Sequence, residues 1–467
     1  MTSNRWIAAA FACALILGGA SGALAQKYGG TLHAVQRENP PNLSIHEAAT
    51  VSVTWVMQPV YSNLVLYNQA HAVESTDDLT PELAESWAWS DGGKKLTFKL
   101  RRGVKWHDGR PFTSADVKYT LDLLREVLPD KKLRLNPRKL WYDNVTSVDT
   151  NGDYEVTLVL KVPQPSILSM LATGYSPIYP AHIDPNDLRT KAIGTGPFKL
   201  KTYQPDQLIE VVKNPDYFVK GRPYLDMISF TVIKDRQARA AALITGQVDI
   251  LMPQEAPITT RDQVLSAVPK MVVNTVAQAA NYNIVINAKR PPFDNLKVRQ
   301  AFNYALNRNA FLKTQLGGAV AGGMVPPPPY NPWGLQETEL RKLPGYGDPA
   351  RDKAKARALL REAGFSESNP LKVTVSTRST PLYQDMAVWM IGELKEVGVE
   401  ATLEIVETAL WFPKLARRDV TVGANMTANG SEDPDAWYFE NFVCGSQRNY
   451  SDYCSKELED EMAKASQ

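Results

Sequence analysis

Few residues in this 467-residue chain have types and spacings that could carry out catalytic chemistry. The pair His46-Glu47 starts like a zinc-binding helix but lacks the second histidine that such a helix supplies. The run from Gly194 to Gly196 (Gly-Thr-Gly) begins like a dinucleotide-binding loop, yet no third glycine follows. The neighbouring acids Glu432 and Asp433 could act as an acid and a base, although adjacent carboxyl groups are more often solvated turn residues. The sequence therefore favours ligand capture, and we expect a protein that is not an enzyme.

The composition is that of an ordinary globular protein. Hydrophobic residues make up 44% and charged residues 22% of the chain, close to common usage. The 52 basic and 50 acidic residues give a net charge of +2, whereas a dedicated nucleic-acid binder carries a clustered basic excess. Five histidines and three cysteines leave little material for a metal centre. We therefore expect no nucleic-acid partner, no metal and no cofactor.

The N-terminus has the features of a secretory signal peptide. Arg5 precedes an apolar run from Trp6 to Leu17, and small residues end in the A-x-A pattern Ala23-Leu24-Ala25. A retained membrane anchor is the alternative, but this run is shorter than the ~20 residues that a membrane span needs. We predict cleavage after Ala25, so that residues 1–25 are removed and the mature protein is exported.

Cleavage would leave two cysteines, Cys444 and Cys454, ten residues apart. An oxidising compartment outside the cytoplasm permits a disulfide. We therefore predict a structural disulfide between them; two unrelated thiols are the alternative.

Strand-like and helical patterns alternate along the chain. Residues 95–100 (KLTFKL) alternate apolar with polar side chains, which predicts a half-buried strand, and residues 145–161 predict a hairpin. A helix is predicted to begin at Ser114. Residues 372–376, 383–397 and 400–406 predict a strand, a helix and a strand, and the right-handed crossover rule makes the two strands a parallel pair. Such a mixture indicates an α/β fold with mixed α+β lobes.

Several longer blocks occur in a characteristic order. They are Ala84 to Trp87 (AESW), 96–124 (LTFKLRRGVKWHDGRPFTSADVKYTLDLL), 194–198 (GTGPF), 214–217 (NPDY), 241–250 (AALITGQVDI), 292–302 (PFDNLKVRQAF), 355–364 (KARALLREAG) and 433–435 (DPD). The chain resembles the family 5 extracellular solute-binding proteins, the periplasmic components of peptide- and nickel-type ABC importers. The blocks cover nearly the whole mature chain. Within block 84–124, we expect Trp87, Trp89, Phe98 and Trp106 to fill a core.

The resemblance implies a periplasmic-binding-protein-like fold of type II or cluster C, with two lobes that close over ligand and an inserted extra lobe. Mapped onto this sequence, lobe I takes residues 26–53 and 187–275, lobe II takes 54–186 and lobe III takes 276–467. In the family the chain then returns to lobe I through a further C-terminal segment. The sequence ends at Gln467, so we expect that return segment to be missing.

The resemblance also points to ligand-binding residues near the C-terminus. Similar dipeptide and oligopeptide binders place a buried aspartate shortly before the Asp-Pro element, where it pairs with the ligand's α-ammonium group. With a one-residue insertion, the matching position here is Asn429, which is neutral. A buried ammonium without an ionic partner costs several kcal/mol, so Asn429 argues against tight capture of free peptide N-termini. Asp433 or Glu432 could take over this role, or Asp433 could instead be a helix N-cap.

Position alone suggests further candidates for the ligand cleft. By resemblance, Trp411 stands where oligopeptide binders have a pocket tryptophan, and Arg378 lies near the place where dipeptide binders pair the ligand carboxylate. Glu38 and Asn42 follow the first strand, on an edge expected to face the cleft. Tyr282 and Asn283 begin a strand that could pair with an extended peptide. Each of these residues could equally have a structural role.

We therefore expect the periplasmic substrate-binding component of an ABC importer, a monomer that captures a peptide or oligopeptide-like solute and delivers it to the permease subunits of the inner membrane. Binding of a non-peptide solute in the same fold, such as an oligosaccharide, an opine or a nickel complex, is the alternative. A secreted hydrolase is the alternative from a different class.

Overall fold

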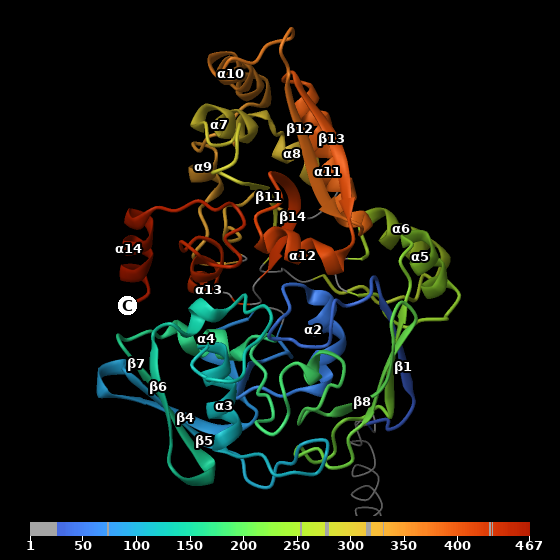
Figure 1. The fold of residues 1–467 in the computed structure, drawn as a ribbon. Helices are drawn as coiled ribbons and strands as arrows, with labels where there is room; N and C mark the ends of the chain where they lie inside the picture. Colours follow the sequence, from blue (N-terminus) through green and yellow to red (C-terminus); the bar gives the residue numbers. More distant parts are fainter. Residues whose placement is uncertain are drawn as a thin grey trace, which may run out of the picture.

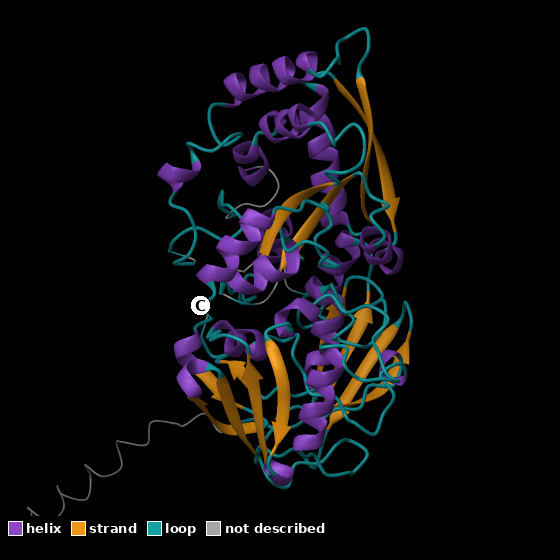
Figure 2. Ribbon diagram, turned by 60° about the vertical axis from the view of Figure 1, so that its left-hand side comes forward, coloured by secondary structure: helices purple, strands orange, loops and turns teal. Residues whose placement is uncertain are grey.

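The structure is a computed structural model, which describes residues 26–71, 74–252, 255–275, 280–313, 319–329, 331–428, 431 and 433–467. The predicted signal peptide, Asn429 and Glu432 lie outside these residues. The described chain contains three four-stranded sheets and a two-stranded sheet of β2 (Val65–Tyr67) and β3 (Leu79–Pro81). Two of the large sheets lie in the lower half of the molecule and the third lies in the upper half (Figures 1 and 2).

The sheet within the predicted lobe I has the order β1-β10-β9-β8, formed by β1 (Thr31–Gln36), β10 (Met227–Val232), β9 (Leu208–Lys213) and β8 (Phe198–Gln204). β1 pairs with β10 in parallel, whereas the other pairs are antiparallel. Side chains of this sheet and of α2 (Val51–Met57) share one core. Helices α5 (Arg236–Ile244) and α6 (Ile258–Ala267) pack together beside Val35 of β1. The strand β1 therefore joins two cores and ends at the seam described below.

The sheet within the predicted lobe II is antiparallel, with the order β4-β5-β7-β6, formed by β4 (Ala84–Ser90), β5 (Lys95–Leu100), β7 (Glu155–Leu160) and β6 (Val145–Thr150). These bounds confirm the predicted strand and hairpin. Helix α3 (Ser114–Leu124) begins with a capping box between Thr113 and Asp116, and α4 (Ser166–Ala172) completes the core. The expectation that Trp89 is a core residue is wrong, since this side chain is 36% exposed. It lies in an edge strand next to a turn.

The sheet within the predicted lobe III has the order β11-β14-β12-β13, formed by β11 (Ala280–Ile286), β14 (Val422–Ala428), β12 (Leu371–Arg378) and β13 (Val399–Val406). β12 and β13 are parallel, as the crossover rule predicted. Helices α7 (Leu296–Ala305), α10 (Pro349–Glu362) and α11 (Pro381–Lys395) share a core with this sheet, and the short helices α8 (Arg308–Phe311) and α9 (Glu337–Leu340) lie nearby. Helix α12 (Thr408–Ala416) packs in a separate core with Val285 of β11.

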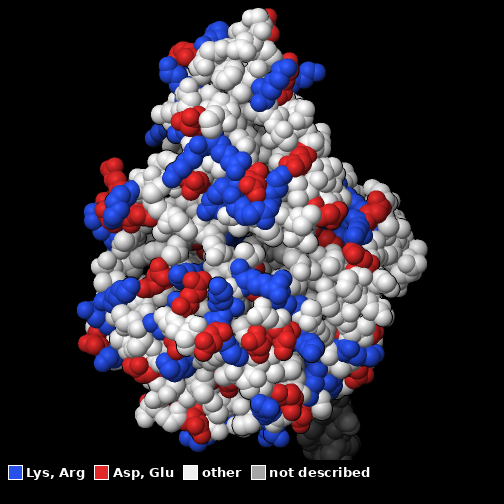
Figure 3. Space-filling view, in the orientation of Figure 1, with Lys and Arg blue, Asp and Glu red and all other residues white. Residues whose placement is uncertain are grey.

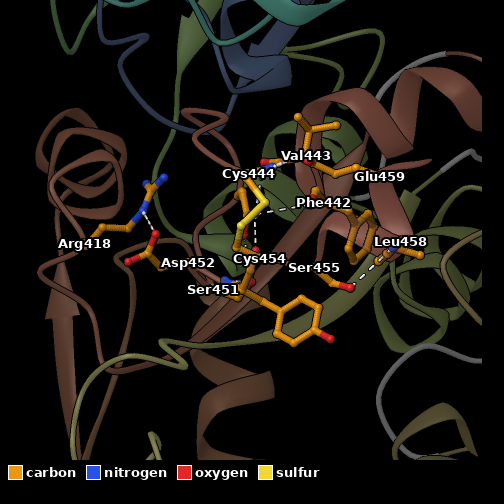
Figure 4. The surroundings of a disulfide bond; sticks show 12 residues. Arg418, Phe442, Val443, Cys444, Ser451, Asp452, Cys454, Ser455, Leu458 and Glu459 are labelled. Carbon is orange, nitrogen blue, oxygen red and sulfur yellow. Dashed lines mark hydrogen bonds and ion pairs between the residues drawn. A yellow bond between two sulfur atoms is a disulfide. The ribbon is translucent and has the colours of Figure 1, made fainter. Parts of the chain in front are cut away.

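The last two helices, α13 (Pro434–Asn441) and α14 (Lys456–Ala465), follow this sheet in the chain, but α13 packs against lobe II. Ala436 belongs to the lobe II core, and the Ser166 hydroxyl donates to Asp435 at 2.6 Å. Cys444 and Cys454 form the predicted disulfide, which lies between α13 and α14 (Figure 4). One large sheet falls within each of the three predicted lobes, and the lobe boundaries themselves stay predictions.

Candidate ligand-binding site

The ends of two distant strands meet at a buried seam between lobe I and lobe III. Glu38 follows β1 and Arg378 ends β12, and both are almost fully buried. Nη2 of Arg378 donates to Oε1 of Glu38 at 2.5 Å, and the Thr380 hydroxyl donates to Oε2 at 2.9 Å. Two residues that sequence analysis proposed separately as ligand contacts are thus paired with each other across the seam.

Further hydroxyl groups complete the surroundings of the Glu38 carboxylate. Ser52 donates from lobe I and Thr408 donates from lobe III. Burial by itself would raise the pKa of Glu38, but Arg378, Arg37 and these hydroxyl donors lower it to about 2. The carboxylate therefore stays ionised at neutral pH, with donors from both lobes.

A second ion cluster adjoins this pair inside lobe I. Nη1 of Arg37 donates to Oε1 of Glu255 at 3.0 Å, and Arg239 donates to the other oxygen of Glu255. Nε of Arg37 lies 3.5 Å from Oε1 of Glu38, without the geometry of a hydrogen bond, and Nη2 of Arg37 also has no hydrogen-bond partner. The seam thus contains donors that the described chain does not use.

Aromatic side chains flank the two arginines. The guanidinium carbon of Arg378 lies 4.5 Å from the ring centre of Tyr383 and 5.2 Å from that of Phe412. Arg378 also donates to the Tyr383 hydroxyl at 3.0 Å. Burial raises the pKa of Tyr282, and Tyr383 adds to this effect. The ring of the predicted contact Tyr282 packs edge-on against Phe311, with 5.7 Å between the ring centres.

Unpartnered polar groups also gather on one face of the lobe III sheet. Asn283 of β11 lies opposite Asn425 of β14, and the Oδ1 atoms of both side chains are buried without a hydrogen-bond partner. Asn283 donates through Nδ2 to the Thr427 hydroxyl at 2.7 Å. On the same face, Trp411 packs against Gly423, where an added Cβ would lie 3.1 Å from the ring. The Nε1 atom of Trp411 is buried and unpartnered too. Buried polar groups normally have partners, so these atoms are candidate contacts for a polar ligand.

The remaining candidates lie elsewhere. Oδ1 of Asn42 accepts a hydrogen bond from the Ser44 amide at 2.7 Å, in a turn. Asp433 is the N-cap of α13, where its Oδ1 accepts from the Asp435 amide at 2.9 Å, so the N-cap alternative is confirmed. Asn429 lies outside the described residues. The ligand-binding roles of all eight residues stay predictions.

Sequence analysis missed several residues of the site. They are Arg37, Thr380, Tyr383, Thr408 and Asn425. A partial signal existed for two of them, because Arg37 precedes a proposed cleft residue and Asn425 interrupts an apolar strand. Nothing in the sequence indicated that Thr380, the N-cap of α11, and Thr408, the first residue of α12, would meet at one carboxylate.

The site differs from the outer surface, where acidic and basic side chains are interspersed on the face shown in Figure 3. Among the described residues, no group of three His, Cys, Asp or Glu side chains could hold a metal ion. Within the same residues, no helix has the length and apolarity that a membrane span requires.

Mixed α/β lobes that meet along a buried polar seam are typical of proteins that bind solutes between their lobes. The chain belongs to the family of bacterial extracellular solute-binding proteins, family 5, whose sequence profile matches residues 78–450.

Named relatives agree with this assignment. The chain is 27% identical to di/tripeptide-binding protein 5 of Pseudomonas aeruginosa, over 88% of this chain and 83% of the relative. It is 32% identical to an ABC transporter peptide-binding protein of Brucella ovis, over 77% of this chain and 66% of the relative.

Solved structures show the same fold. The oligopeptide-binding protein AppA of Bacillus subtilis, in complex with a nonapeptide, has a TM-score of 0.79 and 26% identity, over 94% of this chain and 88% of that one. AgaA of A. tumefaciens R10, in complex with agropinic acid, has a TM-score of 0.78 and 26% identity, over 93% of this chain and 85% of that one.

Proposed function

We propose that this protein captures a peptide or peptide-like solute in the periplasm and delivers it to the permease of an ABC importer. The observation that carries the proposal is the buried polar seam between lobes I and III, where Glu38 meets Arg378. The names of the relatives support the peptide class, since both are named as peptide-binding proteins. Export would follow from signal cleavage after Ala25, and a monomer suffices for this role.

The proposed mechanism is a hinge closure of lobe III onto lobe I around the ligand. Because Glu38 accepts hydrogen bonds from Arg378, Thr380 and Thr408 of lobe III, closure joins opposite charges from two lobes. These contacts are absent when the lobes are apart. They stabilise the closed form, whose surface the permease would recognise.

The lobe III sheet would supply the polar wall of the site. Asn283 and Asn425 offer two carbonyl oxygens to ligand N–H or O–H groups, and Trp411 offers an indole N–H beside them. Tyr282 would pack against the ligand. The neutral Asn429 cannot form an ion pair with an α-ammonium group, so we expect ligands with blocked and free N-termini to bind with similar affinity, unless Asp433 or Glu432 replaces it.

A non-peptide solute is the second candidate. AgaA has a comparable TM-score and was solved with agropinic acid, so a small polar acid is compatible with this fold. Catalysis is the third candidate function. Turnover of substrate by the purified protein would indicate catalysis, whereas stoichiometric retention of unchanged ligand would indicate binding.

Isothermal titration calorimetry and thermal unfolding of the mature protein test the proposal. Mixed di- to hexapeptides, their N-acetylated forms, opines and oligosaccharides would be compared. A ligand at 100 times its Kd adds about 2.7 kcal/mol to the free energy of unfolding, which raises Tm by a few degrees. We expect both the free and the N-acetylated peptides to raise the Tm. Stabilisation by opines or sugars alone would overturn the peptide assignment and leave the binding function intact.

A further inference from the structure

Arg37 has an unused hydrogen-bonding edge. Its side chain is 2% exposed, yet Nε and Nη2 have no hydrogen-bond partner. These two nitrogens share one edge of the planar guanidinium and point their N–H bonds in parallel within the plane, which is the geometry that binds both oxygens of a carboxylate. Nη1 is already used by Glu255. Oε1 of Glu38 lies 3.5 Å from Nε, too long for a hydrogen bond, so this edge of a buried cation is only partly satisfied.

The charges around Arg37 are also unbalanced. The described cluster joins three buried arginines, Arg37, Arg239 and Arg378, to two buried glutamates, Glu38 and Glu255. One positive charge therefore lacks a buried counter-ion in this cluster. Buried charges are normally paired, and a ligand with one negative charge would balance this cluster.

Arg378 is a poorer anion-binding group in this closed arrangement. Its Nη2 donates to Glu38, its Nη1 to Tyr383 and its Nε to Thr408. A ligand carboxylate could reach Arg378 only by displacing Glu38. At Arg37 only the longer 3.5 Å contact between Nε and Oε1 of Glu38 would have to give way.

We propose that Arg37 is the residue that binds a carboxylate of the ligand, through Nε and Nη2, and that the protein therefore selects acidic solutes. This inference rests on the proposed function and names the substrate class of the same site. Arg37 belongs to lobe I, so its edge is uncovered when lobe III swings away and covered when lobe III returns over the ligand.

The test compares tripeptide libraries that differ only at the C-terminus, one with a free carboxylate and one amidated, both free of Asp and Glu. We expect the free acids to bind wild-type protein about tenfold to a hundredfold more tightly, the range for a charge-assisted hydrogen bond pair. In Arg37→Gln this preference should disappear. In Arg37→Lys, which keeps the charge but loses the fork, a preference below tenfold should remain. Arg261→Gln, an exposed position on α6, is the matched control and should behave as wild type.

Two outcomes would overturn the inference: equal affinity of acids and amides for wild-type protein, or an unchanged preference in Arg37→Gln. A second measurement needs no peptide: the Tm of each protein is compared in sodium acetate and in sodium chloride at equal ionic strength. Acetate should raise the Tm of wild type and Arg261→Gln but not of Arg37→Gln. If neither library binds while this acetate effect is present, the peptide function falls and the carboxylate site stands. If acetate has no such effect and neither library binds, both fall. Should Arg37→Gln not fold, the acid and amide comparison in wild type and Arg37→Lys decides.

Discussion

Two buried glutamates connect lobe III segments to the rest of the protein, and they are held in different ways. Glu38 accepts hydrogen bonds from Arg378 and three hydroxyl groups. Glu440 of α13 is fully buried between Arg138 of lobe II, at 3.3 Å, and Arg448, at 2.7 Å. Neither oxygen of Glu440 has a hydrogen bond of good geometry among the described residues. Both sites combine burial with opposite charge, and they differ in their neutral donors.

The pKa values of the two carboxyl groups diverge accordingly. That of Glu38 is lowered to about 2, whereas burial raises that of Glu440 although Arg448 and Arg138 act in the opposite direction. At Glu38, Arg378 and Arg37 together with hydroxyl donors outweigh desolvation, whereas at Glu440 two arginines without such donors do not. We infer that the ionised carboxylate of Glu38 holds the two lobes together, whereas Glu440 serves the packing of α13 against lobe II.

Replacing Glu440 should have the largest effect. Glu440→Ala removes a fully buried side chain from between Arg138 and Arg448, which should lower the free energy of unfolding by about 3–5 kcal/mol. Urea unfolding followed by circular dichroism measures this. Glu337→Gln removes an exposed ion pair with Arg341 and should change stability by less than about 1 kcal/mol. A Glu440 effect as small as this control would show that the triad contributes nothing.

The disulfide should rank second, because Arg448 lies in the loop that it closes. Replacing both Cys444 and Cys454 by Ser should lower the free energy of unfolding by about 2–3 kcal/mol, the chain-entropy value for a short loop. If the bond also orders Arg448, this loss should shrink in a Glu440→Ala background. Additive losses in the double-mutant cycle would instead separate the disulfide from the triad.

Replacing Glu38 should rank third. Glu38→Gln keeps an acceptor for the hydroxyl groups but removes the charge that faces Arg378, with an expected loss of about 2 kcal/mol. Because this contact joins the two lobes, its loss should destabilise the closed arrangement. Small-angle X-ray scattering should therefore record a larger radius of gyration than in wild type. A radius unchanged from wild type, with the same loss of stability, would contradict the role of Glu38 as a closing contact.

Mild acid should have the smallest effect, with opposite signs at the two sites. The folded pKa of Glu38, about 2, is below its ordinary value of 4.5, so its stabilisation is present above 4.5 and is lost as pH falls towards 2. The folded pKa of Glu440 is raised, so its contribution is present below the ordinary value and is lost as pH rises through the folded one.

Urea unfolding at pH 5 and pH 4 should reveal this contrast. Between these pH values each change is below about 1.4 kcal/mol, the limit for one proton per pH unit. Relative to wild type, Glu38→Gln should lose less stability on acidification and Glu440→Gln should lose more. If both variants lost more stability than wild type on acidification, or both lost less, the proposed difference between Glu38 and Glu440 would be wrong.

The sequence alone was sufficient for much of the local structure and for the family. The alternation in 95–100 and the crossover from 372 to 406 predicted β5 and the parallel pair of β12 and β13. Compartment and spacing predicted the disulfide. These features depend on side chains that are close in sequence, so their periods and spacings carry the information. The blocks from Ala84 onward indicated the family for the same reason.

Only the tertiary structure decided which polar groups meet. Glu38 and Arg378 are 340 positions apart, and both were proposed as ligand contacts, yet their pairing depends on how two sheets in different lobes present their strand ends. The same holds for the free edge of Arg37, the facing Asn283 and Asn425, and the position of α13 against lobe II. Desolvation and hydrogen-bond geometry depend on these long-range contacts, and local patterns do not encode them.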